Sequence, residues 1–119
     1  MNQLQCAFVF IMCTVLFVAC HGNPLCSVGC VCRFGYVDCS DMYLDWVPQS
    51  LPNDTTFLVL TNNRIREIRE NDLAQFPNLQ FLQLDGNSIR KIHPNALVPL
   101  KNLTLVDLRS NNLDIEVLD

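Results

Sequence analysis

Four closely spaced cysteines are the side chains of this sequence with the clearest capacity for chemistry: Cys26, Cys30, Cys32 and Cys39. Thiolates at such spacing could bind zinc, or they could be oxidised in pairs to disulfides. Zinc sites of four cysteines usually consist of two short Cys-x-x-Cys-like pairs separated by a longer loop, and reducing conditions favour them. In a secreted chain two disulfides are therefore the favoured interpretation, and the residues alone do not choose among the pairings.

Groups suited to catalysis are sparse in the rest of the chain. His93 precedes Pro94 in an expected turn, where a solvent-facing histidine is the simpler interpretation. The acidic residues are scattered without a pairing pattern, no glycine-rich phosphate loop occurs, and disulfide formation would leave no free thiol beyond the signal region. We therefore expect no enzyme, no cofactor and no metal site.

The first residues indicate secretion. Residues 7–20 form an apolar run interrupted only by Thr14, and no charged side chain occurs before Arg33. This run is too short to span a bilayer, which needs about 20 apolar residues, and it matches the core of a signal peptide. Cleavage could follow Cys20 or Gly22, and an uncleaved anchor is the alternative because the start of the chain lacks a basic side chain. No second apolar run occurs, so we expect a secreted, extracellular protein without a membrane span.

The charge of the chain argues against nucleic acids and anionic membrane surfaces as partners. The formal net charge is −4, and the longest basic run is Arg90-Lys91. Nucleic-acid-binding proteins and proteins that bind anionic membranes usually carry larger basic clusters. The sequence therefore predicts neither a nucleic-acid partner nor a membrane surface.

One apolar pattern recurs three times along the chain and predicts its strands and turns. Residues 55–65, 79–89 and 103–113 each read L-x-x-L-x-L-x-x-N-x-L, with Thr55 as the polar exception and with 24 residues between successive copies. This period and pattern are the signature of leucine-rich repeats. We expect an α/β-type repeat solenoid with a short curved parallel β-sheet on its concave face and an irregular or 3₁₀ convex side. The expected organisation is a signal peptide at 1–22, a cysteine-rich cap at 23–50, and three repeats without a carboxy-terminal cap at 51–119.

The alternation of side chains along each strand predicts a binding surface. Residues at alternate positions point to opposite faces of a sheet, so one set builds the core and the other faces outward. The outward set forms three rows across the repeats, of which the first is apolar. An exposed apolar row usually marks an interface, although packing against Tyr36 or Trp46 would also explain it. The predicted ligand-binding residues are Phe57, Phe81 and Leu105 in the first row, Val59, Gln83 and Asp107 in the second, and Thr61, Asp85 and Arg109 in the third.

The charged members of these rows have two interpretations. Asp85, Asp107 and Arg109 could recognise a charged ligand, or they could form a solvated ion-pair cluster.

The repeated asparagines Asn63, Asn87 and Asn111 have an expected structural role. Each lies where the chain leaves a strand, and an amide can both donate and accept hydrogen bonds there, which bridges the backbones of adjacent turns. The return segments should bury their apolar positions. These are Ile68, Leu73 and Phe76 in the first segment, and Ile92, Leu97 and Leu100 in the second.

Two glycosylation sequons occur, at Asn53-Asp54-Thr55 and Asn102-Leu103-Thr104. Both asparagines lie just before an expected strand, at the rim of the sheet. A glycan can be accommodated at each of these positions.

The combination of cap and repeats resembles a known family. The spacing Cys26-x3-Cys30-x-Cys32-x6-Cys39, followed by Val47-Pro48, Leu51-Pro52 and the first repeat, is similar to the amino-terminal part of small leucine-rich proteoglycans, nearest to the decorin and biglycan class. The resemblance covers about residues 26 to 113. It implies the disulfide pairs Cys26–Cys32 and Cys30–Cys39. Other extracellular leucine-rich-repeat proteins, including immune receptors, share this type of cap.

Some features of the family do not transfer. No serine precedes Cys26 after the expected signal peptide, so a glycosaminoglycan chain there is not expected. The next apolar position of the pattern after Leu113 is occupied by Glu116, and the collagen-contacting repeats of the family lie beyond this segment.

The sequence thus predicts a secreted, non-enzymatic protein that binds an extracellular protein or matrix component through its concave face. The alternative is a truncated or isoform fragment, with a mainly structural role, of a larger matrix proteoglycan or immune-type receptor. In a further alternative the chain is a complete small protein, and a second copy or another partner covers the end of the array after the third repeat.

Overall fold

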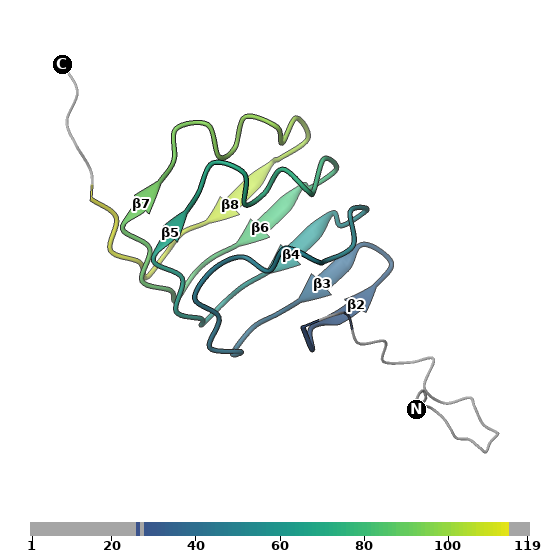
Figure 1. The fold of residues 1–119 in the computed structure, drawn as a ribbon, viewed down its shortest axis with the longest axis horizontal. Coiled ribbons are helices and arrows are strands. Elements are labelled where there is room, and N and C mark those ends of the chain that lie inside the picture. Colours follow the sequence, from purple (N-terminus) through teal and green to yellow (C-terminus); the bar gives the residue numbers. More distant parts are fainter. Residues whose placement is uncertain (1–25, 27, 115–119) are drawn as a thin grey trace.

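The computed structural model describes residue 26 and residues 28–114. A five-stranded sheet dominates this part, in the order β2-β3-β4-β6-β8 (Figure 1). Its strands are β2 (Val31–Arg33), β3 (Tyr36–Asp38), β4 (Phe57–Val59), β6 (Phe81–Gln83) and β8 (Leu105–Asp107). The two cap strands are antiparallel, and every later pairing is parallel. The predicted signal peptide lies outside the described residues.

The strand register follows the 24-residue period. Leu58 pairs with Leu82 and Leu82 with Val106 across the three repeat strands. Equal spacing returns the chain to the same height in each repeat, so like residues align and inward leucines stack on inward leucines. The result is the predicted leucine-rich repeat solenoid.

The core is one continuous apolar cluster between the main sheet and the return segments. Its largest fully buried side chain is Phe76, which the sequence placed inward. Burial of a leucine-sized side chain contributes about 1.5–3 kcal/mol relative to exposure. The members from the repeats are Leu58, Leu60, Ile65, Ile68, Leu73, Phe76, Leu79, Leu82, Leu84, Ile89, Ala96 and Leu100.

The asparagines after the strands join each turn to the previous one. The side-chain nitrogen of Asn87 donates to the carbonyl oxygens of Leu60 (2.9 Å) and Leu84 (3.0 Å), and its oxygen accepts the backbone N–H of Ile65 (3.1 Å). Asn111 makes the equivalent bonds one repeat later. These amides satisfy buried backbone groups that no regular strand pairing reaches.

Thr55, the polar exception in the first repeat, is fully buried. Its hydroxyl donates to the carbonyl oxygen of Pro52 over 2.6 Å. A buried hydroxyl is tolerated when it has such a partner. The threonine therefore replaces the expected leucine at a point where a nearby backbone carbonyl can accept its hydroxyl hydrogen bond.

The convex side consists of turns and one short parallel ladder. Strands β5 (Glu67–Ile68) and β7 (Lys91–Ile92) pair Glu67 with Lys91 and Ile68 with Ile92. They run beside the main sheet in Figure 1. The sequence predicted an irregular or 3₁₀ convex side. In residues 28–114 the return segments contain no 3₁₀ helix, so the convex side is irregular.

One inward position of the return segments was predicted wrongly. Leu97 is 36% exposed, whereas Leu73, its equivalent one repeat earlier, is fully buried. The neighbouring Ala96 is buried, as is its equivalent Asp72 one repeat earlier. The first return segment, which contains Leu73, has the segment around Pro48 on one side and the second return segment on the other. Among the described residues no third return segment packs over Leu97.

The cap is fixed by the disulfides Cys26–Cys32 and Cys30–Cys39, the pairing that the family resemblance implied. Cys30 and Cys39 are fully buried and belong to the core. The β2–β3 hairpin turns at Phe34 and Gly35, which both have positive φ. A Cβ at Gly35 would lie 3.0 Å from the hydroxyl of Thr56, so glycine lets the hairpin pack tightly on the first repeat.

Candidate binding surface

The first outward row of the sheet is an aromatic ladder. The strand register places Tyr36, Phe57, Phe81 and Leu105 side by side on four consecutive strands. The ring centroids of Tyr36 and Phe57 are 5.2 Å apart, and those of Phe57 and Phe81 are also 5.2 Å apart. Stacked and tilted aromatic pairs at this distance attract each other. The two phenylalanines are half-buried, whereas Leu105 is 49% exposed.

The side chains of this ladder pack on one another and are also partly exposed to solvent. Tyr36 covers part of Phe57, which is the contact that the sequence offered as an alternative to binding. Trp46 lies elsewhere, on the side of the return segments, against Arg69. The ladder still presents four neighbouring large side chains to solvent along one line of the sheet.

The second row is less accessible than the sequence predicted. Val59, which the sequence predicts as a contact residue, is only 6% exposed. In the strand register it lies between Asp38 of the cap and Gln83 of the next repeat. Gln83 and Asp107 remain partly exposed.

The third row makes two polar contacts, one within the row and one to the second row. The hydroxyl of Thr61 donates to Asp85 over 2.8 Å. The guanidinium of Arg109 contacts both carboxylate oxygens of Asp107, at 2.9 Å from Nε and 2.7 Å from Nη2. Two-point contacts of this kind are geometrically specific.

This ion pair shifts both titrations. The side-chain hydrogen bonds of Arg109, and then its backbone N–H, hold the pKa of Asp107 below its usual range. The carboxylate in turn raises the pKa of Arg109. Asp107 is therefore ionised at neutral pH. Most of the Arg109 side chain remains in solvent, where it can meet a negatively charged partner.

The two sequons lie in exposed turns. Asn53 and Asn102 are both exposed. The threonine of the first sequon is the buried Thr55, whereas Thr104 of the second is exposed and donates to the carbonyl oxygen of Gln80 over 3.0 Å. Neither asparagine belongs to the three outward rows. Glycans at these sites would leave the aromatic ladder open.

The sequence offered Tyr36 of the cap as a neighbour of the first row, but it did not predict that the cap extends the rows themselves. Tyr36 and Asp38 extend the first and second rows by one strand. Tyr36 precedes its partner Phe57 by 21 residues, not 24, so the period of the repeats does not reach it. The apolar alternation at Tyr36-Val37-Asp38-Cys39 was the available signal. No feature of the sequence indicated that Phe34, at the hairpin tip, is fully exposed.

The described residues show little that suggests chemistry beyond binding. Among them, no group of three or more histidine, cysteine or acidic side chains is arranged to hold a metal ion. His93 accepts the backbone N–H of Asn95 at 3.1 Å and lies 3.4 Å from Glu70. No helix within the described residues is long and apolar enough to cross a membrane.

The repeats match known proteins. Residues 55–113 match the family model described as leucine rich repeat. Human decorin is 47% identical over 57 residues, which are 48% of this chain and 16% of decorin. Decorin from Coturnix japonica is 48% identical over the same length. Biglycan from Xenopus laevis is 47% identical over 55 residues, 46% of this chain and 15% of biglycan. The matched segment therefore spans about one sixth of the length of these relatives.

Proposed function

We propose that this leucine-rich-repeat chain, which resembles the decorin and biglycan class, is a secreted, non-enzymatic protein that binds an extracellular protein or matrix component. The binding surface is the concave face of the main sheet. The observation that carries the proposal is the ladder of Tyr36, Phe57, Phe81 and Leu105, which the register lines up across four strands. Aromatic residues on a rigid surface are typical anchors of protein interfaces.

The neighbouring rows supply the polar rim that such an interface needs. Gln83 and Asp85 offer hydrogen-bonding groups beside the ladder, and Arg109 offers a fixed positive charge. Because Asp107 orients Arg109, the guanidinium loses little conformational freedom when a partner binds. The surface favours a partner with an apolar strip flanked by a carboxylate.

The test uses the most exposed member of the ladder, so that folding is preserved. The secreted wild-type chain, immobilised on beads, is incubated with solubilised extracellular matrix, and retained proteins are quantified by mass spectrometry. We expect Leu105→Glu to lose the proteins that the wild type retains, by about tenfold or more. Phe34→Ser is the matched control, because Phe34 is fully exposed but lies outside the ladder.

Equal retention by the wild type and Leu105→Glu would rule out the concave-face proposal. It would favour the alternative, in which the chain has a mainly structural role in a larger matrix proteoglycan or receptor. A thermal unfolding curve of each variant shows whether the comparison is made between folded proteins.

A second copy or another partner at the third repeat remains a separate proposal. Val106 and Leu108 of that repeat are only partly buried, unlike Leu82 and Leu84 of the second. Light scattering of the secreted chain measures directly whether it self-associates. A strictly monomeric, cooperatively folding species would argue against self-association there.

A further inference from the structure

A groove of about 380 Å³ lies along the β5–β7 ladder, away from the aromatic ladder of the main sheet. Four cations line it: Arg66, Arg69, Arg90 and Lys91. The whole chain contains only eight Lys and Arg and carries a net charge of −4. Half of its cations therefore gather in one groove of an acidic protein.

The repeat period is what gathers them. Arg66 and Arg90 are separated by 24 residues, and β5 pairs with β7 in register, so the two arginines occupy equivalent places in adjacent repeats. Neighbouring strands are about 4.8 Å apart. In the sequence only Arg90-Lys91 is a basic run, and the fold adds Arg66 and Arg69 beside it.

The cations differ in how freely they can meet a ligand. Among the described residues, Arg66 and Lys91 have no carboxylate within ion-pair distance, and both are exposed. Arg90 pairs with Asp114 at 3.1 Å, in a contact where both side chains are mostly in solvent. Such exposed pairs contribute little and exchange partners easily.

Arg69 is the fixed member of the group. The carboxylate of Asp72, which is almost fully buried, accepts the backbone N–H of Arg69 at 2.8 Å and its Nε–H at 3.0 Å. The guanidinium carbon lies 5.7 Å from the centre of the Trp46 ring. A buried carboxylate and an indole thus hold Arg69 in place on the groove wall.

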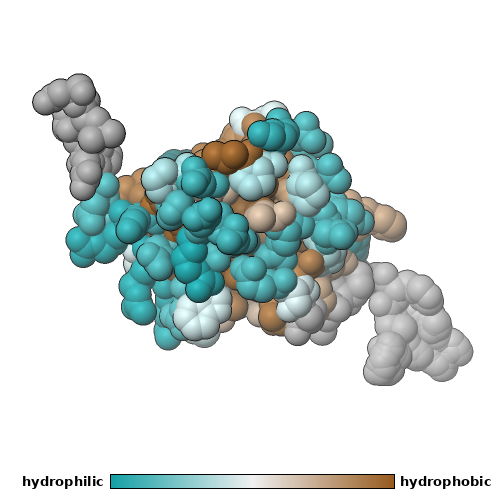
Figure 2. Space-filling model, turned by 45° about the horizontal axis from the view of Figure 1, so that its top comes forward, coloured by the Kyte–Doolittle hydropathy of each residue, from teal (hydrophilic) through white to brown (hydrophobic). Residues whose placement is uncertain are grey.

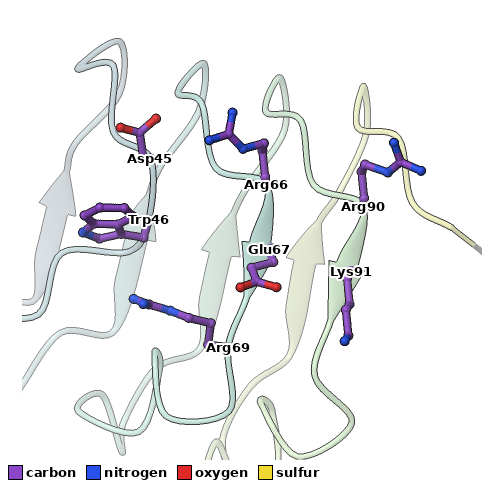
Figure 3. Close-up of a pocket in the computed structure, with 7 residues that line it drawn as sticks. All are labelled: Asp45, Trp46, Arg66, Glu67, Arg69, Arg90 and Lys91. Atoms are coloured by element: carbon purple, nitrogen blue, oxygen red, sulfur yellow. The ribbon is translucent and has the colours of Figure 1, made fainter.

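The remaining lining residues indicate what kind of anion fits. Trp46 is 58% exposed and stands with Asp45 along one side of the groove, while Arg90 and Lys91 stand along the other (Figure 3). Glu67 lies between them in the same view. An exposed indole offers a flat apolar face to a sugar ring, and carboxylates accept hydrogen bonds from hydroxyl groups.

This mixture favours a ligand that carries hydroxyl groups as well as anionic groups. Asp45 and Glu67 would repel anionic groups placed beside them, whereas they can accept hydrogen bonds from hydroxyls. The face shown in Figure 2 is likewise mainly hydrophilic, with hydrophobic residues only in small patches.

We propose that the groove between Trp46 and the Arg66, Arg69, Arg90 and Lys91 cluster binds a sulfated oligosaccharide. Its sulfate groups contact Arg66 and Lys91, and one sugar ring lies against Trp46. Arginine forks bind tetrahedral oxyanions with two-point geometry. This site is separate from the concave face, so the chain would hold a matrix glycan and a protein partner at the same time.

The test measures binding of a heparin-derived oligosaccharide to the secreted chain by calorimetry. Arg66→Gln combined with Lys91→Gln should weaken binding by at least about tenfold, because two charge-assisted contacts are lost. Arg33→Gln combined with Lys101→Gln is the control: both residues are exposed and outside the groove, and the change in net charge is the same. The control should bind within about twofold of the wild type.

Two further measurements distinguish the ligand chemistry. Raising the ionic strength from about 0.1 M to about 1 M shortens the screening length from about 10 Å to about 3 Å and should abolish most of the binding. The chemically desulfated oligosaccharide should not bind, and a polyglutamate peptide should bind much more weakly than the sulfated one.

Equal losses in the two double variants would overturn the proposal, because binding would then follow net charge alone. Equal binding of polyglutamate would also overturn it and would assign the groove to acidic peptides. Leu105→Glu should keep the affinity for the oligosaccharide, so failure of the concave-face proposal and failure of this one are separable.

Discussion

The cap and the repeats extend the same sheet but are held together by different chemistry. In the cap, the covalent bonds Cys26–Cys32 and Cys30–Cys39 fix β2 and β3. In the repeats, the amides of Asn87 and Asn111 fix the turns through hydrogen bonds to the preceding repeat. A repeat that packs on a similar repeat can use the same asparagine hydrogen bonds each time. A short terminal segment cannot use such recurring bonds.

Asn63 lies at the junction and combines the two regions. Its side-chain oxygen accepts the backbone N–H groups of Met42 (3.0 Å) and Leu44 (2.9 Å) in the cap. Its nitrogen donates to the carbonyl oxygen of Cys39 over 2.9 Å. The first asparagine of the series therefore attaches the disulfide-bonded segment to the array. The comparison shows that an asparagine of this series can join two turns only where the preceding segment places a backbone carbonyl oxygen within reach of its side chain.

The largest expected effect comes from the buried disulfide. Cys30→Ser combined with Cys39→Ser should lower the free energy of unfolding by about 3–5 kcal/mol, because the cross-link is lost and two hydroxyls enter the core. The partly exposed pair, replaced as Cys26→Ser with Cys32→Ser, closes a loop of similar size and should cost about 2 kcal/mol. Chemical denaturation measures both, and equal losses would contradict the role assigned to burial.

An intermediate loss of stability is expected when the asparagine hydrogen bonds of the repeats are removed. Asn87→Ala should lower the free energy of unfolding by about 2–4 kcal/mol, because it leaves the carbonyl oxygens of Leu60 and Leu84 and the N–H of Ile65 without their partner. The exposed Asn112→Ala is the control and should change it by less than about 0.5 kcal/mol. If the two alanine variants unfolded at the same denaturant concentration, the amide would not be the stabilising group.

The smallest effect concerns the surface pair of the third repeat. Arg109→Gln removes the guanidinium hydrogen bonds, the largest cause of the lowered pKa of Asp107, but keeps the backbone N–H of residue 109, so this pKa should rise part of the way towards its usual value. A depressed folded-state pKa stabilises the fold above the unfolded-state value, about 3.9, and this contribution is lost as the pH falls below it. Arg109→Gln should therefore reduce the extra stability near neutral pH and flatten the loss below about pH 4.

A carboxyl-detected NMR titration of Asp107 in the wild type and in Arg109→Gln tests this directly. Arg33→Gln serves as the control, since Arg33 lies on β2 and should leave the Asp107 titration unchanged. An unchanged Asp107 titration in Arg109→Gln would show that another group holds the carboxylate ionised.

The repeats were predictable because a fixed period determines both strand register and the buried face. Leu58, Leu82 and Val106 could be placed on one face from the sequence pattern alone. The cap could not be aligned in this way, because Tyr36 and Phe57 pair at a spacing that the repeats do not use. Its disulfide pairing came from family resemblance, not from the residues themselves.

The surface was harder to predict than the core for a physical reason. Alternation along a strand shows which way a side chain points, but its exposure depends on neighbours from other strands. Val59 is covered although it points outward, and Leu97 is uncovered although its repeat equivalent is buried. The basic groove was missed for the same reason, since Arg66 and Lys91 become neighbours only when the repeats stack.

The short β5–β7 ladder has a consequence for the shape of any partner. Hydrogen-bonded strands keep nearly the same spacing, about 4.8 Å, wherever they occur. Here they occur on both sides of the first two repeats, so the inner and outer edges of these two repeats advance by almost equal steps. A stack whose two edges advance equally bends only gently. The main sheet therefore presents a shallow platform that suits a broad or extended partner, and it does not form a deep cradle that could enclose a small globular one.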